Sequence, residues 1–85
     1  MDVSISDAAP SPSESLGRYI MRVRNSLCLT QSELSIKAGI HVQTIRKIES
    51  GVTSRLSQKG KSGLAAALGI PQVYLDAVVI QTPIA

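Results

Sequence analysis

Side chains able to do catalytic chemistry are few in this sequence. Its 85 residues include one histidine, His41, and one cysteine, Cys28. These two residues cannot make a structural zinc site by themselves, and a single cysteine cannot form a disulfide within the chain. Serine and acidic residues do not pair with His41 once the helices are placed, and no glycine-rich phosphate loop follows a strand. We therefore expect no catalytic residue, no metal site and no cofactor.

The basic residues, in contrast, are concentrated in one part of the chain. All nine Lys and Arg residues lie between Arg18 and Lys61, and only Glu33 and Glu49 oppose them there. This segment carries nine minus two, or +7, whereas the whole chain carries +3. Such a distribution favours a polyanionic partner; the alternative is a solvated basic surface without a partner.

One small domain must position these residues, because a chain of this length buries only about 60–65% of the surface that its unfolded form exposes. Phe and Trp are absent and only two Tyr are present, although 44% of the residues are hydrophobic. Leu, Ile and Val must therefore form the core, which suits short packed helices. No apolar run approaches the ~18–20 residues of a membrane span, and the N-terminus lacks a signal-peptide pattern. We expect a soluble, cytoplasmic protein.

The N-terminal part of the sequence predicts an arm followed by a helix. Residues 1–11 lack helical periodicity, so we expect an arm that is flexible or weakly extended. The sequence Ser11-Pro12-Ser13-Glu14 then places a hydroxyl at the N-cap, proline at N1 and glutamate at N3 of a first helix. The apolar residues of this helix share one face at helical spacing. They are Leu16, Ile20, Val23 and Leu27.

Two short helices follow, joined through a glycine. The sequence Thr30-Gln31-Ser32-Glu33 is a capping box that opens a helix ending at Ala38, before Gly39. His41 is placed to cap the next helix, at about residues 42–49. The inward positions of the pair are Leu34, Ala38, Ile40, Ile45 and Ile48. This arrangement describes a helix-turn-helix, whose second helix is short enough to lie in the major groove of DNA.

The rest of the sequence predicts two more helices and completes a compact, all-α, five-helix fold. Leu64 to Leu68 form the core turns of a fourth helix, and Pro71 is N1 of a fifth. The helix-turn-helix domain is expected to span residues 12–76, followed by an apolar tail at 77–85. Because Val78 to Ile80 are β-branched, the tail is expected either to pack on the first helix or to leave as an extended arm. The arm could contact a second subunit or another protein.

Four blocks of residues, all in register, carry a resemblance to a known family. They are Leu29-Thr30-Gln31-x-Glu33-Leu34, Lys37-Ala38-Gly39-Ile40, Thr44-Ile45-x-Lys47-Ile48-Glu49-x-Gly51 and Leu64-Ala65-x-Ala67-Leu68-Gly69-Ile70. With them, the segment from Leu16 to Leu75 resembles the phage repressor/Cro-type helix-turn-helix family, also called the xenobiotic-response-element family. The resemblance covers about two-thirds of the chain. It implies a domain that binds double-stranded DNA through the third helix.

The resemblance also implies roles for individual residues. The residues that it places on bases are Val42, Gln43 and Lys47. Gln43 can form a bidentate pair with adenine, Lys47 can donate to guanine, and Val42 can meet a thymine methyl group. The resemblance places Gln31 on the DNA backbone. Thr44 and Arg46 can also reach a phosphate, and Arg55 in the following loop is placed for contact with the backbone or the minor groove. For each of these positions the alternative is an ordinary solvated side chain.

A partly buried salt bridge between Arg24 and Glu49 is a further implication of the resemblance. It would tie the first helix to the end of the third, and loss of either partner would strand a charge. His41 is expected to cap the third helix or to touch a phosphate.

The sequence departs from the family pattern at three places: Cys28, the start of the fourth helix, and Ile36, which is apolar where the surface of the second helix is usually charged. Cys28 stands where the family often has glycine, and its apolar neighbours predict a semi-buried side chain. The stretch from Val52 to Ser57 reads as a loop. Because Gly60 and Gly63 weaken the fourth helix, we expect this loop to be longer and more mobile, extending to Ser62.

These features predict a sequence-specific transcriptional regulator that binds double-stranded DNA as a homodimer. One short recognition helix reads few bases, whereas two helices related by a twofold axis read half-sites about 34 Å apart. An antitoxin or a restriction-modification controller protein of the same fold is an alternative. A protein-interaction module that no longer binds DNA is another, and a weak dependence of partner binding on salt would distinguish it.

Overall fold

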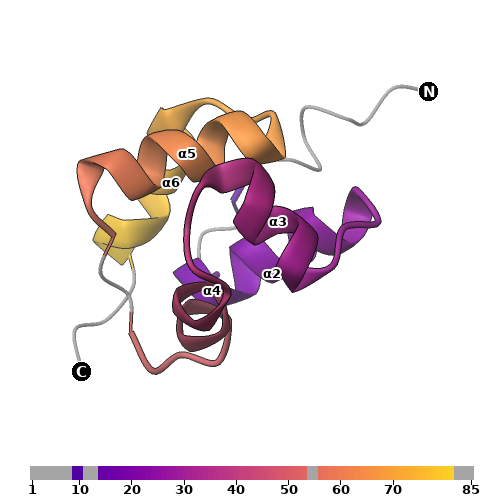
Figure 1. The fold of residues 1–85 in the computed structure, drawn as a ribbon. Helices are drawn as coiled ribbons and strands as arrows, with labels where there is room; N and C mark the ends of the chain where they lie inside the picture. Colours follow the sequence, from indigo (N-terminus) through magenta and orange to yellow (C-terminus); the bar gives the residue numbers. More distant parts are fainter. Residues whose placement is uncertain (1–8, 11–13, 54–55, 82–85) are drawn as a thin grey trace.

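Helices account for all the regular structure in the residues that the computed structural model describes, which are 9–10, 14–53 and 56–81. They are α2 (Leu16–Ser26), α3 (Gln31–Ala38), α4 (Val42–Glu49), α5 (Gln58–Leu68) and α6 (Gln72–Gln81) (Figure 1). The prediction of an all-α, five-helix fold is confirmed for this part of the chain. None of the described helices is long and apolar enough to cross a membrane.

Helix α2 begins later than the sequence suggested. Its N-cap is Ser15, whose side chain accepts a hydrogen bond from the Arg18 amide at 3.4 Å. Glu14 precedes the helix, so its assignment to N3 is wrong; the expected cap residues Ser11 to Ser13 lie outside the described residues. The reason is that the Glu14 carboxylate accepts from both Nε and Nη2 of Arg22, at 2.8 and 3.0 Å.

The inward face of α2 matches the expected stripe except at its end. Leu16, Ile20 and Val23 are buried, and the buried ring of Tyr19 joins them. Leu27, in contrast, is 46% exposed. The helix ends at Ser26, so Leu27 is the C-cap and no longer follows the buried face.

The caps predicted for α3 and α4 are confirmed. Thr30 and Glu33 form a reciprocal capping box, and α3 ends at Gly39, whose φ of 69° is left-handed. The His41 Nδ1 atom accepts from the Gln43 amide at 3.1 Å, which caps α4. The turn between the two helices is therefore fixed by local hydrogen bonds at both ends.

Helix α5 starts earlier than the expected loop from Val52 to Ser62 would allow. Ser57 caps it by accepting from the Gly60 amide at 3.0 Å, and the helix starts at Gln58, so the loop does not extend to Ser62. The low helix propensity of Gly63 is offset by packing, because a Cβ at this position would overlap the backbone carbonyl oxygen of Ala38. Glycine lets α5 lie directly against α3.

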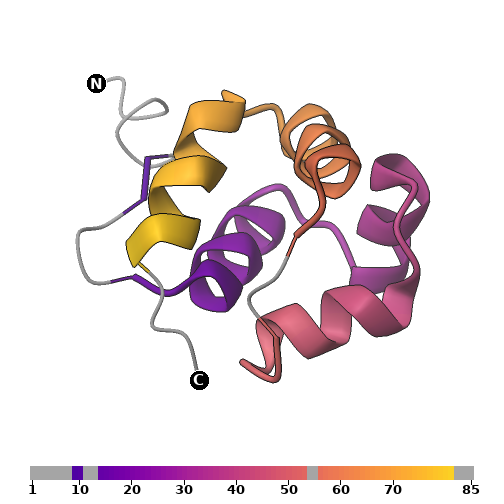
Figure 2. The same cartoon turned by 90° about the vertical axis from the view of Figure 1, so that its left-hand side faces the viewer.

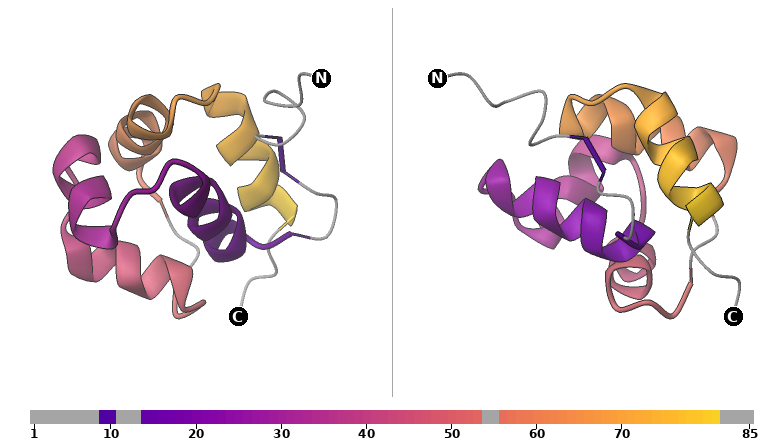
Figure 3. Two further views of the ribbon diagram at one scale, coloured as in Figure 1. Left: turned by 90° about the vertical axis from the view of Figure 1, so that its right-hand side faces the viewer. Right: turned by 180° about the vertical axis from the view of Figure 1, so that it is seen from behind.

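The core is built from buried residues of all five described helices, and Figure 2 shows the others around α2. Helix α2 contacts α4 on one side and α6 on the other, while α3 contacts both α4 and α5. Figure 3 shows the same arrangement from the right-hand side of Figure 1 and from behind. A Cβ at Gly17 would overlap the Ile48 carbonyl oxygen, so this glycine permits α2 to approach the end of α4. The fully buried side chains are Tyr19, Leu16, Ile20, Leu34, Ile45, Ile48, Leu64, Leu75 and Val78.

The C-terminal helix decides between the two alternatives for the first residues of the tail. Helix α6 starts at Gln72, directly after Pro71, and continues to Gln81, so Val78 to Ile80 are helical and not extended. Val78 is fully buried in the core. The side chains of Val79 and Ile80, the tail residues 82–85 and most of the N-terminal arm lie outside the described part, so their expected contacts stay predictions.

Candidate nucleic-acid interface

Helix α4 presents a polar face opposite its buried one. Ile45 and Ile48 are buried in the core, while Gln43, Arg46 and Lys47 are exposed. Val42 and Thr44, at the start of the helix, are half-buried. Figure 2 shows α4 along the lower edge of the molecule, below α3. The three residues that the sequence placed on bases therefore lie on one short, capped helix at the periphery.

Five basic side chains in the described part have no acidic partner within salt-bridge distance. Arg22, Arg24 and Lys61 are paired, with Glu14, Glu49 and Asp76 respectively. The unpaired cations among the described residues are Arg18, Lys37, Arg46, Lys47 and Lys59. Arg55 lies outside the described residues. Two of the five are on α4, so the excess positive charge of the middle segment includes the exposed face of this helix.

The start of α3 offers hydrogen-bond donors next to α4. Gln31 is the first residue of α3, and Thr30 caps the helix by accepting from the Glu33 amide at 3.0 Å. In the part of the chain that the structure describes, the backbone amides of Gln31 and Ser32 donate to no protein atom. Free amides at a helix N-terminus favour anions such as phosphate.

A bidentate ion pair joins α2 to the last residue of α4. Arg24 donates from Nε and Nη2 to the two carboxylate oxygens of Glu49, at 2.8 and 3.0 Å, and from Nη1 to the carbonyl of Leu29 at 2.7 Å. The side chains are only 12% and 4% exposed. Hydrogen bonding to Glu49 raises the pKa of Arg24, while burial acts in the opposite direction. The pair that the family resemblance implied is thus present.

Glu49 has a third partner that the sequence did not reveal. The side-chain amide of Gln31 donates from Nε2 to Glu49 Oε1 at 3.1 Å. Nothing in the spacing of residues 31 and 49 indicates this bond, because it depends on how α3 and α4 cross. The residue expected to hold a phosphate is thereby linked to the structural ion pair.

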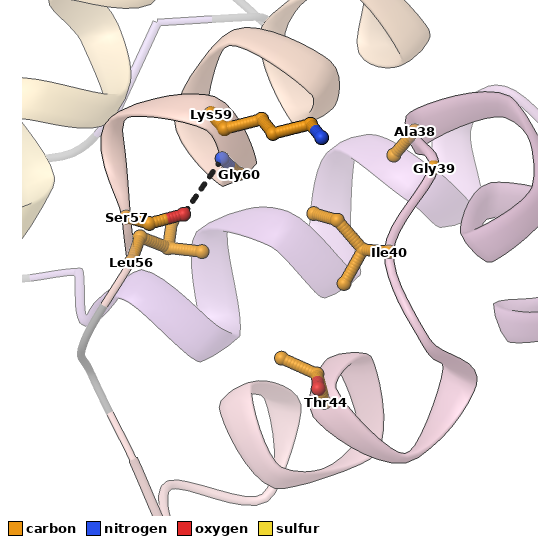
Figure 4. Close-up of a pocket in the computed structure, with 8 residues that line it drawn as sticks. All are labelled: Ala38, Gly39, Ile40, Thr44, Leu56, Ser57, Lys59 and Gly60. Atoms are coloured by element: carbon orange, nitrogen blue, oxygen red, sulfur yellow. Dashed lines mark hydrogen bonds between the residues drawn. The ribbon is translucent and has the colours of Figure 1, made fainter.

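A pocket of about 390 Å³ lies beside the turn of the motif (Figure 4). Its lining residues are Ala38, Gly39, Ile40, Thr44, Leu56, Ser57, Lys59 and Gly60. Lys59 and Thr44 face it from α5 and α4. Lys59 was not singled out by the sequence; its place in the first turn of α5 became visible only with the true start of that helix. Within the described ranges, no three His, Cys, Asp or Glu side chains gather where they could hold a metal ion.

Residues 20–59 match a family model described as Helix-turn-helix (HTH_3). The match contains α3, the turn and α4, together with most of α2. This segment is a Cro/C1-type helix-turn-helix domain of the XRE family. The resemblance to this family is thus confirmed for residues 20–59. DNA is the partner that such a domain implies, and the family is typically non-enzymatic.

Proposed function

We propose that this protein is a sequence-specific transcriptional regulator that places α4 in the major groove of double-stranded DNA. The observation that carries the proposal is the exposure of Gln43 and Lys47 on a helix whose opposite face is fixed in the core. A base-reading side chain gains specificity when its helix is held rigidly. Val42, at the start of the same face, is the third residue proposed to contact bases.

The backbone contacts are proposed to flank this helix. Gln31 and the free amides of α3 would hold a phosphate on one side, while Thr44, Arg46 and Arg55 would contact the backbone along α4 and the loop that follows. These contacts supply affinity and position, and the base contacts supply discrimination.

We also propose that the protein works in the cytoplasm as a homodimer. The eight residues of α4 can reach few base pairs, so a single copy would recognise too short a site. Sedimentation of the full chain with a duplex carrying two half-sites is expected to give two protein copies per duplex. One copy at saturation would contradict the dimer.

The assignment of base-reading residues is tested by Gln43→Ala combined with Lys47→Ala. This double variant is expected to lose its preference for a selected operator, because each bidentate base contact contributes ~1–3 kcal/mol of discrimination. It should keep weak, salt-sensitive binding to any duplex. Fluorescence anisotropy with operator and random duplexes measures both quantities.

Arg46→Ala is the matched control, since it removes a charge from the same helix. It is expected to weaken binding to the operator and to the random duplex by the same factor. Unchanged operator preference in the Gln43/Lys47 double variant would refute the assignment.

A protein-interaction role is the second candidate, and exposed apolar side chains favour it. Ile36 on α3 and Val73 on α6 are 80% and 63% exposed. An antitoxin of the same fold would use such surfaces for a toxin, whereas a controller protein would regulate a neighbouring restriction system. Affinity for DNA should fall with salt at a log–log slope of about −0.9 per neutralised phosphate, whereas apolar association should not weaken.

A further inference from the structure

The orientation of the Gln31 amide is determined by Glu49. An ionised carboxylate only accepts hydrogen bonds, so Glu49 Oε1 can face Nε2 of Gln31 but repels Oε1 of the same amide. The structure accordingly has Nε2 turned to Glu49, at 3.1 Å. One of the two N–H groups of Nε2 is used in this bond, and the other remains for a second acceptor.

Glu49 is itself held in place. Both of its oxygens accept from Arg24, and its side chain is 4% exposed at the junction of α2 and α4. Gln31, in contrast, is half-buried at the start of α3, where ligands can reach it. The guanidinium of Arg24 also neutralises the charge of Glu49, which would otherwise repel an anion nearby.

We propose that Glu49 is a positioning residue for the phosphate contact of Gln31, in addition to its role in the ion pair. The proposal rests on the proposed function, because it takes a DNA phosphate as the acceptor. A side chain already fixed in its donor orientation loses less conformational freedom when it binds. The buried ion pair is thereby connected to the affinity for DNA through one hydrogen bond.

A double-mutant cycle tests this coupling. Gln31→Ala is expected to weaken duplex binding about tenfold, as the loss of one hydrogen bond to a charged group would. In a Glu49→Gln background the same change is expected to cost about twofold or less. In glutamine an NH2 group replaces one of the two carboxylate oxygens. With the carbonyl oxygen kept on Arg24 Nε, which makes the shorter bond, the NH2 group faces Gln31 and cannot accept from its Nε2.

Two results of the cycle would overturn the proposal. An equal loss in both backgrounds would make Glu49 purely structural. A larger loss in the Glu49→Gln background would mean that Glu49 competes with the phosphate for the amide. The four proteins are compared at a temperature at which circular dichroism reports all of them folded.

A measurement on the free wild-type protein keeps the proposal testable if Glu49→Gln does not fold. The side-chain amide of Gln31, observed by nitrogen–proton correlation spectra, is expected to be shifted and protected from exchange relative to that of Gln58. Gln58 is a matched control because it is the first residue of α5 and is exposed. Equal shifts and exchange for the two amides would overturn the proposal. Absence of duplex binding with a protected Gln31 amide would instead refute the proposed function.

Discussion

Arg24 and Glu49 form the least exposed ion pair among the described residues. Each charge is desolvated, and each is compensated by bidentate geometry and by a further hydrogen bond. A pair of this kind adds little stability compared with apolar side chains packed in the same place. Removal of one partner, however, leaves the other charge buried without compensation. The pair therefore fixes how α2 and α4 meet.

Replacement of Arg24 by methionine should be strongly destabilising for this reason. We expect Arg24→Met to lower the free energy of unfolding by about 3–5 kcal/mol. Arg18→Met, which removes an exposed arginine of the same helix, is expected to change it by less than about 0.5 kcal/mol. Urea unfolding measures both. A similar small change in the two variants would contradict the assigned role of the pair.

Tyr19 makes stability sensitive to high pH. Burial raises the pKa of its hydroxyl to about 12, from the ordinary value of 10.0, and nearby Arg22 opposes the increase. Since the unfolded chain ionises first, the contribution of Tyr19 is fully present below pH 10 and is lost as the pH rises towards 12. Through this hydroxyl the free energy of unfolding falls by at most about 1.4 kcal/mol per pH unit.

Urea unfolding between pH 9 and about pH 12 compares the variants Tyr19→Phe and Tyr74→Phe. We expect Tyr19→Phe to reduce the fall in stability, whereas Tyr74→Phe should retain it. The interpretation fails if both variants follow the wild-type curve.

Single residues show clearly where sequence reasoning stops. Cys28 was expected to be semi-buried, yet it is exposed, with a left-handed φ of 59°. The family's frequent glycine at this position was the signal, because a left-handed backbone favours glycine. The bond between Gln31 and Glu49 had no comparable signal, since it joins residues distant in the chain.

At the scale of the helix, the local sequence predicts helix boundaries better than it predicts the contacts of single residues. Capping residues located the start of α3 and α4 correctly, since a cap acts within one turn. The start of α2 was misplaced because a contact from elsewhere decides it: Arg22 holds Glu14. The loop from Val52 to Ser57 agrees with the start of α5 at Gln58, but its expected extension to Ser62 was wrong, because α3 requires glycine in α5. Helix propensity alone favours alanine over glycine at position 63, whereas the contact with the Ala38 carbonyl requires glycine.

Gly63→Ala tests this explanation of α5. The substitution would favour the isolated helix by about 1 kcal/mol, but the added methyl group meets the Ala38 carbonyl. We expect a net loss of about 1–3 kcal/mol in the free energy of unfolding. Gly60→Ala is the matched control, because its Cβ would meet side-chain atoms, which can move, and it should cost less. A Gly63→Ala protein as stable as wild type in urea would contradict the explanation.

For the whole molecule, folding restricts the unpaired positive charge to fewer residues than the sequence suggests. Ion pairs remove three of the basic residues from the positive excess, and the exposed cations of α4 remain. The domain thus combines helix α4, whose apolar face is fixed in the core, with donors at the start of α3 and an ion pair that connects them. The sequence predicted the fold class and the residues of the exposed helix face, because both follow from periodicity and caps. The hydrogen bonds among Arg24, Glu49 and Gln31 behind that face do not follow from periodicity and caps, because they depend on how α2, α3 and α4 cross.

Selection of bound sequences from random double-stranded DNA tests the central claim most directly. We predict that the wild-type chain enriches an inverted repeat whose half-sites are centred about 34 Å apart. The protein with Gln43→Ala and Lys47→Ala should enrich none. Failure of the wild-type protein to enrich any sequence, together with binding that is insensitive to salt, would contradict DNA recognition through α4.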